Sequence, residues 1–136
     1  MNIETEENMQ KKVVFSFEKL EVWQESKELI MDIYTATKAF PEKEKFSLCS
    51  QMQRSSVSIA SNIAEGCSRS SLKEQLRFTE IAYGSLLELY CQLLIAMDLG
   101  YINEQSMEII QNRFESISSK LSALRNSQQK RLTLNP

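Results

Sequence analysis

The sequence predicts an all-α protein, folded as an antiparallel up-down-up-down four-helix bundle. Its 136 residues include only three Gly and two Pro, so long stretches run without a helix breaker. Along these stretches apolar residues recur at steps of three and four, which is the spacing of one helical face. The connections between them are short, and short connections favour antiparallel neighbours. The chain therefore fits one domain, with the bundle expected over residues 15–126.

The first helix is expected from about Glu18 to Thr37, with Trp23, Ile30 and Ile33 on its inner face. A second stripe at the same rhythm is acidic, and we expect it to be a solvated outer face. This acidic stripe consists of Glu18, Glu21, Glu25, Glu28 and Asp32. Residues 1–14, which precede the bundle, are expected to be a flexible N-terminal segment.

The second helix is expected to begin at Pro41, because proline suits a first helical turn and the residue before it avoids helical geometry. Gly66 is expected to end this helix. Ser71 and Glu74 have the spacing of a capping box, which predicts the start of a third helix that runs to about Leu99.

The fourth helix is expected after Gly100, with Asn103 as its N-cap. Its apolar stripe has three-four spacing and consists of Met107, Ile110, Phe114, Ile117, Leu121 and Leu124. Residues 127–136 are polar, and we expect them to be a flexible tail that frays.

The composition indicates a cytoplasmic protein that contains no disulfides. The three cysteines, Cys49, Cys67 and Cys91, are odd in number and far apart, and the N-terminus is acidic where a secretory signal is basic and then apolar. The membrane-like run from 81 to 99 contains Glu88 near its midpoint, where a carboxylate costs roughly 2.5–3.5 kcal/mol in a bilayer. We therefore expect no membrane partner and a buried helix in this region.

The third helix indicates self-association. From 81 to 99 it is apolar at 14 of 19 positions, and a helix that is apolar on nearly all sides must be covered on nearly all sides. A lone four-helix bundle covers about half of each helix. We expect a homo-oligomer with Tyr83, Leu87, Tyr90 and Leu94 as interface anchors.

Catalysis is not expected, because the chemical groups for it are missing. The chain has no histidine, which removes Ser-His-Asp and Cys-His catalysis and the Glu-x-x-His ligands of di-iron bundles. Glu25 and Glu28 have the spacing of half a magnesium site, but no matching Glu-x-x-Asp follows on a later helix. No glycine-rich phosphate loop occurs. We expect neither an enzyme, a cofactor nor a metal.

A polar ridge follows one face of the second helix. Its members recur at steps of three and four, and they are Gln51, Arg54, Ser58, Asn62 and Glu65. The ridge is either a solvent-exposed face or a structural network with Ser85 and Glu88 of the third helix, which a hairpin turning near Ser68 would bring level with it. Buried arginine and glutamate need partners, so we favour the network.

Nucleic-acid binding is the alternative that composition leaves open. Two basic clusters could contact phosphates, one of Arg69, Lys73 and Arg77 and one that includes Arg113, Lys120 and Arg125. Against this stands a net charge of -2, whereas general nucleic-acid binders have a basic excess. The other interpretation is a surface on which these cations balance Glu74, Glu80 and Glu115.

The order of four motifs matches a known family. The motifs are Phe17-Glu-Lys-Leu20-Glu-Val-Trp23-Gln, Phe40-Pro41-x-x-Glu44, Gln51-x-x-Arg54-Ser-Ser-x-Ser58-Ile59-x-x-Asn62-Ile-Ala-Glu-Gly66 and Ala82-x-Gly84-Ser85-Leu-x-Glu88. Over roughly Phe15 to Leu124 the chain resembles the four-helix-bundle proteins encoded in intervening sequences of bacterial 23S rRNA genes. The resemblance implies a homopentamer without an established catalytic activity.

The chain is also similar to a relative of that family, the accessory protein of diversity-generating retroelements. That relative is a pentameric barrel that binds a reverse transcriptase and nucleic acid through a basic surface. The resemblance implies RNA or a reverse transcriptase as a partner. This chain departs from the relative in being mildly acidic.

Overall fold

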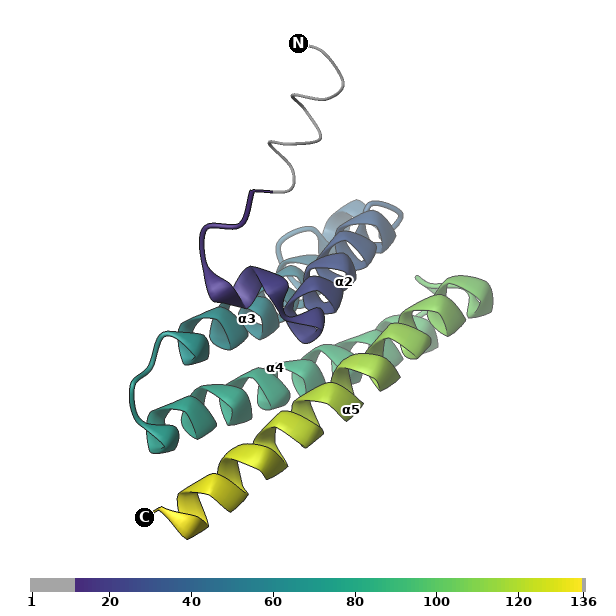
Figure 1. Cartoon of the computed structure of the whole chain (residues 1–136). Coiled ribbons are helices and arrows are strands. Elements are labelled where there is room, and N and C mark those ends of the chain that lie inside the picture. Colours follow the sequence, from purple (N-terminus) through teal and green to yellow (C-terminus); the bar gives the residue numbers. More distant parts are fainter. Residues whose placement is uncertain (1–11, 136) are drawn as a thin grey trace.

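Four α-helices form the fold of residues 12–135, the part of the chain that the computed structural model describes (Figure 1). Two short 3-10 helices accompany them, one before the first α-helix and one between the first and the second, and this part of the chain contains no strand. The elements are η1 (Ser16–Lys19), α2 (Glu21–Thr37), η2 (Glu42–Glu44), α3 (Leu48–Cys67), α4 (Leu72–Asp98) and α5 (Glu104–Leu134). The all-α prediction is confirmed. Most of the expected N-terminal segment, residues 1–11, lies outside the described residues.

The beginning of the first helix is divided into two parts. Leu20 is extended between η1 and α2, so the continuous helix starts at Glu21 and not at Glu18. The Glu18 carboxylate accepts hydrogen bonds from the backbone N–H groups of Phe15 and Val14, and these bonds lower its pKa. The acidic stripe therefore begins with a residue that closes the preceding turn.

The second helix begins later than the proline predicts. Pro41 introduces only the 3-10 turn η2, and α3 starts at Leu48. Proline marks where a helical turn is allowed, whereas the length of a helix depends on packing. The expected end is confirmed, because α3 closes at Cys67 next to Gly66. A Cβ atom on Gly66 would lie 3.0 Å from the Cβ of Phe78, so glycine permits a close approach of α3 to α4.

The predicted N-caps of the two long helices are confirmed, but the Glu74 carboxylate pairs with Arg77 and does not complete the predicted capping box. The Ser71 hydroxyl accepts the backbone N–H of Glu74 at 3.1 Å at the start of α4. The Asn103 side chain accepts the backbone N–H of Ser106 at 2.8 Å at the start of α5. Between these helices Gly100 has a φ of 78°, a left-handed conformation that favours glycine.

The last helix extends past the expected boundary at residue 126. We expected residues 127–136 to fray, but α5 continues to Leu134. Gln128 is 5% exposed and Leu132 is half-buried, so the helix still packs against the bundle there. In Figure 1 the C-terminal end of α5 lies beside the start of α4. A hollow lined by Gln75, Thr79, Gln128 and Arg131 confirms this proximity.

All four α-helices contribute to the hydrophobic core. Full burial of a leucine or isoleucine side chain contributes about 1.5–3 kcal/mol relative to exposure. The largest fully buried aliphatic residues are Leu29, Ile33, Met52, Ile59, Leu86, Leu89, Leu93, Met107, Ile117 and Leu121.

The helices are arranged so that α2 and α4 each contact both α3 and α5. No contact joins α2 to α4 in the described residues, so these two helices occupy opposite corners of the bundle. Along the contact of α4 with α5, Tyr83 meets Ser118 and Tyr90 meets Gln111. Higher residue numbers on α4 therefore contact lower residue numbers on α5.

Candidate interaction surfaces

The outer side of α4 is an exposed apolar surface, which we call the α4 face. It consists of Ile81, Gly84, Leu87, Cys91, Leu94 and Ile95, all of which are solvent-exposed. Leu87 is 56% exposed and Ile95 is 46% exposed. These residues lie between the α3 and α5 sides of the helix, so the bundle itself does not cover them. The charged residues of this part of α4 are Glu88 and Asp98, both acidic.

The four expected interface anchors divide into two pairs. Leu87 and Leu94 belong to the α4 face, at 56% and 42% exposure. Tyr83 and Tyr90 instead pack within the chain against α5. The Tyr90 ring meets Phe114 edge-on at 5.3 Å, and the Tyr83 hydroxyl shares a hydrogen bond with Ser118, which lowers the Tyr83 pKa. The tyrosines join two helices of one chain, and only the leucines remain exposed.

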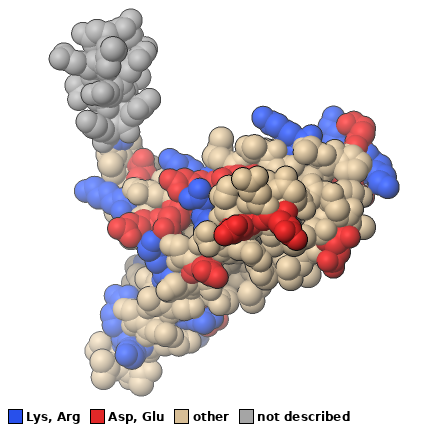
Figure 2. Space-filling model, turned by 90° about the vertical axis from the view of Figure 1, so that its right-hand side faces the viewer, with Lys and Arg blue, Asp and Glu red and all other residues tan. Residues whose placement is uncertain are grey.

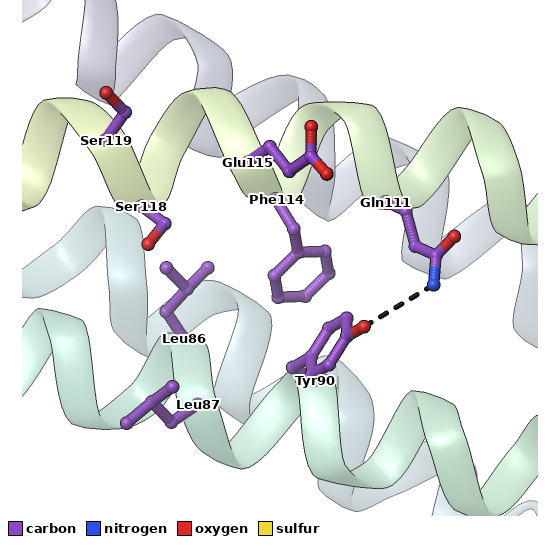
Figure 3. Close-up of a pocket in the computed structure, with 8 residues that line it drawn as sticks. All are labelled: Leu86, Leu87, Tyr90, Gln111, Phe114, Glu115, Ser118 and Ser119. Carbon is purple, nitrogen blue, oxygen red and sulfur yellow. Dashed lines mark hydrogen bonds between the residues drawn. The ribbon is translucent and has the colours of Figure 1, made fainter.

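A groove of about 480 Å³ lies beside the α4 face, between α4 and α5 (Figure 3). Leu86, Leu87 and Tyr90 line it from α4, and Phe114 lies opposite Tyr90. Its α5 side is completed by Gln111, Glu115, Ser118 and Ser119. Because Leu87 belongs to both, the apolar α4 wall of the groove continues into the α4 face, while the α5 wall of the groove is mostly polar.

The polar ridge of α3 makes a network in its middle part. Ser58 and Ser85 share a hydrogen bond of 2.8 Å across the α3–α4 contact. The Asn62 side chain donates to the backbone carbonyl of Ser58 at 2.8 Å and to its hydroxyl at 3.1 Å. These three polar residues are buried or half-buried, and each has a hydrogen-bond partner. This part of the ridge fixes how α3 lies on α4.

The charged and outer members of the ridge are exposed. Gln51, Arg54 and Glu65 all face solvent, and so does Glu88 on α4. Within residues 12–135 no ion pair reaches Arg54, Glu65 or Glu88. The expected pairing of Arg54 with Glu88 inside one chain is therefore not formed.

The register of the α3–α4 hairpin differs from the expected one. A turn near Ser68 would bring Gln51 level with Ser85, but Ser58 holds that position. The chain turns between Cys67 and Leu72, further along than assumed. The shift is two helical turns, which preserves the face of each helix and changes only which residues meet.

One pair in this contact was missed by sequence reasoning. The Ser55 hydroxyl, 4% exposed, donates to the Gln92 side-chain carbonyl at 2.8 Å, and Gln92 is 6% exposed. The Gln92 amide also donates to Glu88 at 3.4 Å. Gln92 was visible in the sequence as part of a thin polar line on an apolar helix, and that line indicates where α3 packs.

Two of the expected nucleic-acid contacts are already occupied by carboxylates of α2. Arg113 forms ion pairs with Glu28 and Asp32, and Lys120 binds Glu25 at 2.6 Å and Glu21 at 3.6 Å. The expectation of a solvated acidic stripe is therefore wrong for Glu25 and Asp32, which are half-buried, and holds for Glu21 and Glu28, which stay exposed. All four carboxylates pair with α5, and we call this side of the bundle the α2–α5 flank.

Hydrogen bonds from two residues of α5 meet at the Glu25 carboxylate. Partial burial opposes ionisation of this carboxyl, but hydrogen bonds from Lys120 and Ser116 outweigh it and lower the Glu25 pKa. The same hydrogen bond to Glu25 raises the Lys120 pKa. Both shifts favour the charged pair at neutral pH.

The other expected nucleic-acid contacts gather near one end of the bundle. Arg69 and Arg77 lie on the Phe78 ring at 4.8 and 4.6 Å, and Arg125 lies over Tyr83 at 4.6 Å. Arg77 also pairs with Glu74 at 3.0 Å, while Lys73 is exposed. On the side shown in Figure 2 basic residues occur in several separate places among acidic ones.

The described residues contain no group of three or more His, Cys, Asp or Glu side chains that could hold a metal ion. One helix, α4, is long and apolar enough to cross a membrane by length and composition, and a third of its most apolar window is buried in the bundle. Such a helix is weak evidence for a membrane span, because the core helix of a soluble protein meets the same test.

Known proteins resemble most of this chain. A solved structure of a protein of unknown function from the S23 ribosomal protein family of Bacteroides thetaiotaomicron VPI-5482 superposes with a TM-score of 0.71 at 26% sequence identity. The match covers 76% of this chain and 97% of that one. No curated protein matches. The family model of the 23S rRNA-intervening sequence protein matches residues 18–123, and the chain therefore belongs to this family.

Proposed function

We propose that the protein is a non-catalytic scaffold or interaction protein that acts as a homo-oligomer, with the α4 face buried between copies. The observation that carries this proposal is that Leu87, Leu94 and Ile95 are exposed together on the outer side of α4, while the inner side of the same helix forms part of the core. Large exposed apolar patches on soluble proteins mark interaction sites. The resemblance noted above favours a pentamer as the closed form.

An aqueous interface explains the α4 face better than a lipid environment does. The face includes Glu88 near its middle, and Ser85 and Gln92 on the same helix are bound to α3. A carboxylate at the centre of a bilayer costs roughly 2.5–3.5 kcal/mol. At the rim of a protein interface the same carboxylate stays hydrated or meets a cation. We therefore propose a cytoplasmic protein without a membrane partner.

The proposed bundle has up-down-up-down topology. Its support is the order of the cross-helix contacts on two sides. On α4 and α5, Tyr83 meets Ser118 and Tyr90 meets Gln111, and on α2 and α5, Glu25 meets Lys120 and Asp32 meets Arg113. On each side, the residue numbers of the contacts rise on one helix and fall on the other, as expected for antiparallel neighbours.

A mass measurement tests the proposal directly. In light scattering coupled to size exclusion, the full chain at micromolar concentration should have a mass several times the 15.7 kDa of one chain. Leu94→Asp places a charge in the α4 face and should shift the protein toward the single-chain mass. Circular dichroism should show unchanged helix content, because Leu94 is not part of the core.

A matched control separates this effect from a general effect of surface charge. Ile109 is 58% exposed on α5, and it shares a face with Arg113 and Ser116, away from the α4 face. Ile109→Asp should keep the wild-type mass. A wild-type chain that stays monomeric at micromolar concentration would overturn the scaffold proposal.

A second candidate function is binding of RNA or of a reverse transcriptase as an accessory protein. The observation that favours it is that Arg69 and Arg125 each lie over an aromatic ring of α4, Phe78 and Tyr83, while Lys73 is exposed in the first turn of the same helix. From 121 to 134 α5 carries basic residues and no acidic one. Several copies of such an end in one oligomer would combine into a larger basic surface.

A salt series on structured RNA tests this candidate. Binding through phosphates should weaken steeply as salt rises, and Arg69→Glu combined with Lys73→Glu should weaken it further. Arg113→Gln serves as the control, because α2 carboxylates already hold that guanidinium. No binding at low salt would remove nucleic acid as a partner.

A further inference from the structure

A second apolar surface lies on the opposite side of the molecule, across α2 and α3. We define this α2–α3 surface by Met31, Tyr34, Lys38, Arg54 and Val57, all of which are exposed. Met31 is 64%, Tyr34 is 41% and Val57 is 39% exposed. A shallow hollow of about 470 Å³ runs between Tyr34, Arg54 and Val57. Exposed apolar side chains therefore also occur on a second surface of the described residues, apart from the α4 face.

The charges on these two surfaces are opposite. The α4 face carries Glu88 and Asp98 and no cation from 81 to 99. The α2–α3 surface carries Lys38 and Arg54, and no ion pair within residues 12–135 engages either of them. The lining of its hollow contains no carboxylate. Opposite charges around apolar patches steer association and fix which surfaces meet.

We propose that the α4 face of one copy docks on the α2–α3 surface of a second copy, in a head-to-tail contact. This inference rests on the proposed self-association and names the two surfaces that make it. Because α2 and α4 occupy opposite corners of the bundle, each copy can hold one neighbour at each surface. A repeated contact between two different surfaces generates a ring when the rotation closes.

The alternative symmetric contact, with two α4 faces packed together, is disfavoured by charge. It would place Glu88 and Asp98 of one copy near the same two carboxylates of the other. Like charges brought together across an interface cost several kcal/mol. Docking on the α2–α3 surface brings the same carboxylates near Lys38 and Arg54 instead.

Charge reversal tests the inference. Variant A carries Glu88→Lys and Asp98→Lys, and variant B carries Lys38→Glu and Arg54→Glu. All four residues are exposed, so each variant should keep the wild-type helix content. Each variant alone should dissociate at a concentration about tenfold or more above that of the wild type, since like charges now face each other. A chain with all four substitutions should recover the wild-type mass.

Mixing the two variants gives the sharpest result. The lysines on the α4 face of variant A match the glutamates on the α2–α3 surface of variant B, and the α4 face of variant B keeps the wild-type contact with the α2–α3 surface of variant A. Only contacts between two copies of the same variant repel, so an equimolar mixture should form assemblies in which the two variants alternate, heavier than either variant alone in sedimentation velocity. The new contact should weaken as salt rises, because exposed charges are screened.

The outcomes separate this inference from the proposed function. A monomeric wild type would overturn both. An oligomeric wild type whose mass is unchanged in variant B would overturn the head-to-tail contact alone, because the α2–α3 surface would then not be used. Failure of the four-substitution chain to reassemble would also overturn it.

Discussion

The α2–α5 flank and the α4 face differ in whether their surface side chains have partners within the chain. On the flank, Arg113 and Lys120 are bound by four carboxylates of α2, and the exposed surface there is satisfied within one chain. On the α4 face, leucine and isoleucine side chains meet solvent, and the carboxylate of Glu88 has no cationic partner in the described residues. The side chains of the flank are paired within a single copy, whereas the apolar side chains of the α4 face remain exposed in it.

This difference shows that burial within one chain does not account for the whole sequence. The inner side of α4 is closed by Leu86, Leu89 and Leu93, each at most 2% exposed. Its outer side has the same residue types without cover. In the proposed assembly, the inner apolar residues of α4 serve the fold of one copy and the outer ones serve the contact between copies.

The largest expected effect comes from comparing the two sides of α4. Leu89→Ala removes a side chain that is 0% exposed and should lower the free energy of unfolding by about 3 kcal/mol, through lost burial and a cavity. Leu87→Ala, two residues earlier and 56% exposed, should cost the dissociated chain about 0.5 kcal/mol or less. Urea denaturation followed by circular dichroism measures both.

Protein concentration sharpens this comparison. If Leu87 is buried between copies, its truncation should lower stability more at high protein concentration, where the wild type is assembled. The cost of Leu89→Ala should stay nearly constant. If both truncations lowered the free energy of unfolding equally and independently of protein concentration, the inner and outer sides of α4 would have the same role in stability.

The second comparison uses two arginines, Arg113 on the α2–α5 flank and Arg54 on the exposed side of α3. Arg113→Ala leaves the half-buried Asp32 carboxylate without its cation, and we expect a loss of about 1 kcal/mol after allowing for partial solvent screening. Arg54→Ala should leave the unfolding free energy of the dissociated chain unchanged, because no ion pair of the described residues reaches it. A salt titration checks the cause, since the Arg113 effect should shrink with salt. If Arg54→Ala lowered the unfolding free energy of the dissociated chain more than Arg113→Ala does, Arg54 and not Arg113 would be the arginine that stabilises the single chain.

Much of the fold could be predicted because its signals are local. The caps at Ser71 and Asn103 and the stop at Gly100 depend on residues within one turn, and the structure has all three. The register of α3 on α4 could not be predicted in the same way. A shift of seven residues leaves every residue on its face, so periodicity alone cannot distinguish Ser58 from Gln51 opposite Ser85.

The site residues show the same limit. Periodicity placed Glu25, Glu28 and Asp32 on one face, but it carries no information about which helix covers that face. The end of α5 was misjudged for a related reason. Gln128 occupies the position where the apolar stripe would continue after Leu121 and Leu124. The apolar pattern therefore ends before Gln128, although the helix continues to Leu134.

The pH dependence of the flank is a smaller effect with a defined sign. Hydrogen bonds from Lys120 and Ser116 lower the pKa of Glu25 in the folded protein. A lowered carboxyl pKa contributes stability that is present above the unfolded value near 4.5 and lost as pH falls through the folded value. Glu25→Gln should therefore cost a fraction of a kcal/mol at pH 7, roughly the value of a partly exposed pair. The stability difference from the wild type should vanish in acid, as measured by urea midpoints from pH 7 to pH 3. An unchanged difference at pH 3 would show that Glu25 acts through packing.

The smallest effect tests whether the chain satisfies all its own polar groups on α5, as it does along the flank. Gln128 is only 5% exposed, and its buried side-chain oxygen has no hydrogen-bond partner. An unsatisfied buried polar group destabilises, and an apolar group of the same shape removes that cost. Gln128→Met should therefore leave the free energy of unfolding nearly unchanged or raise it slightly. Gln129→Met, at the exposed neighbouring position, is the control and should change little. A loss of stability in Gln128→Met alone would mean that the amide is bonded in solution, and the end of α5 would then belong with the satisfied flank.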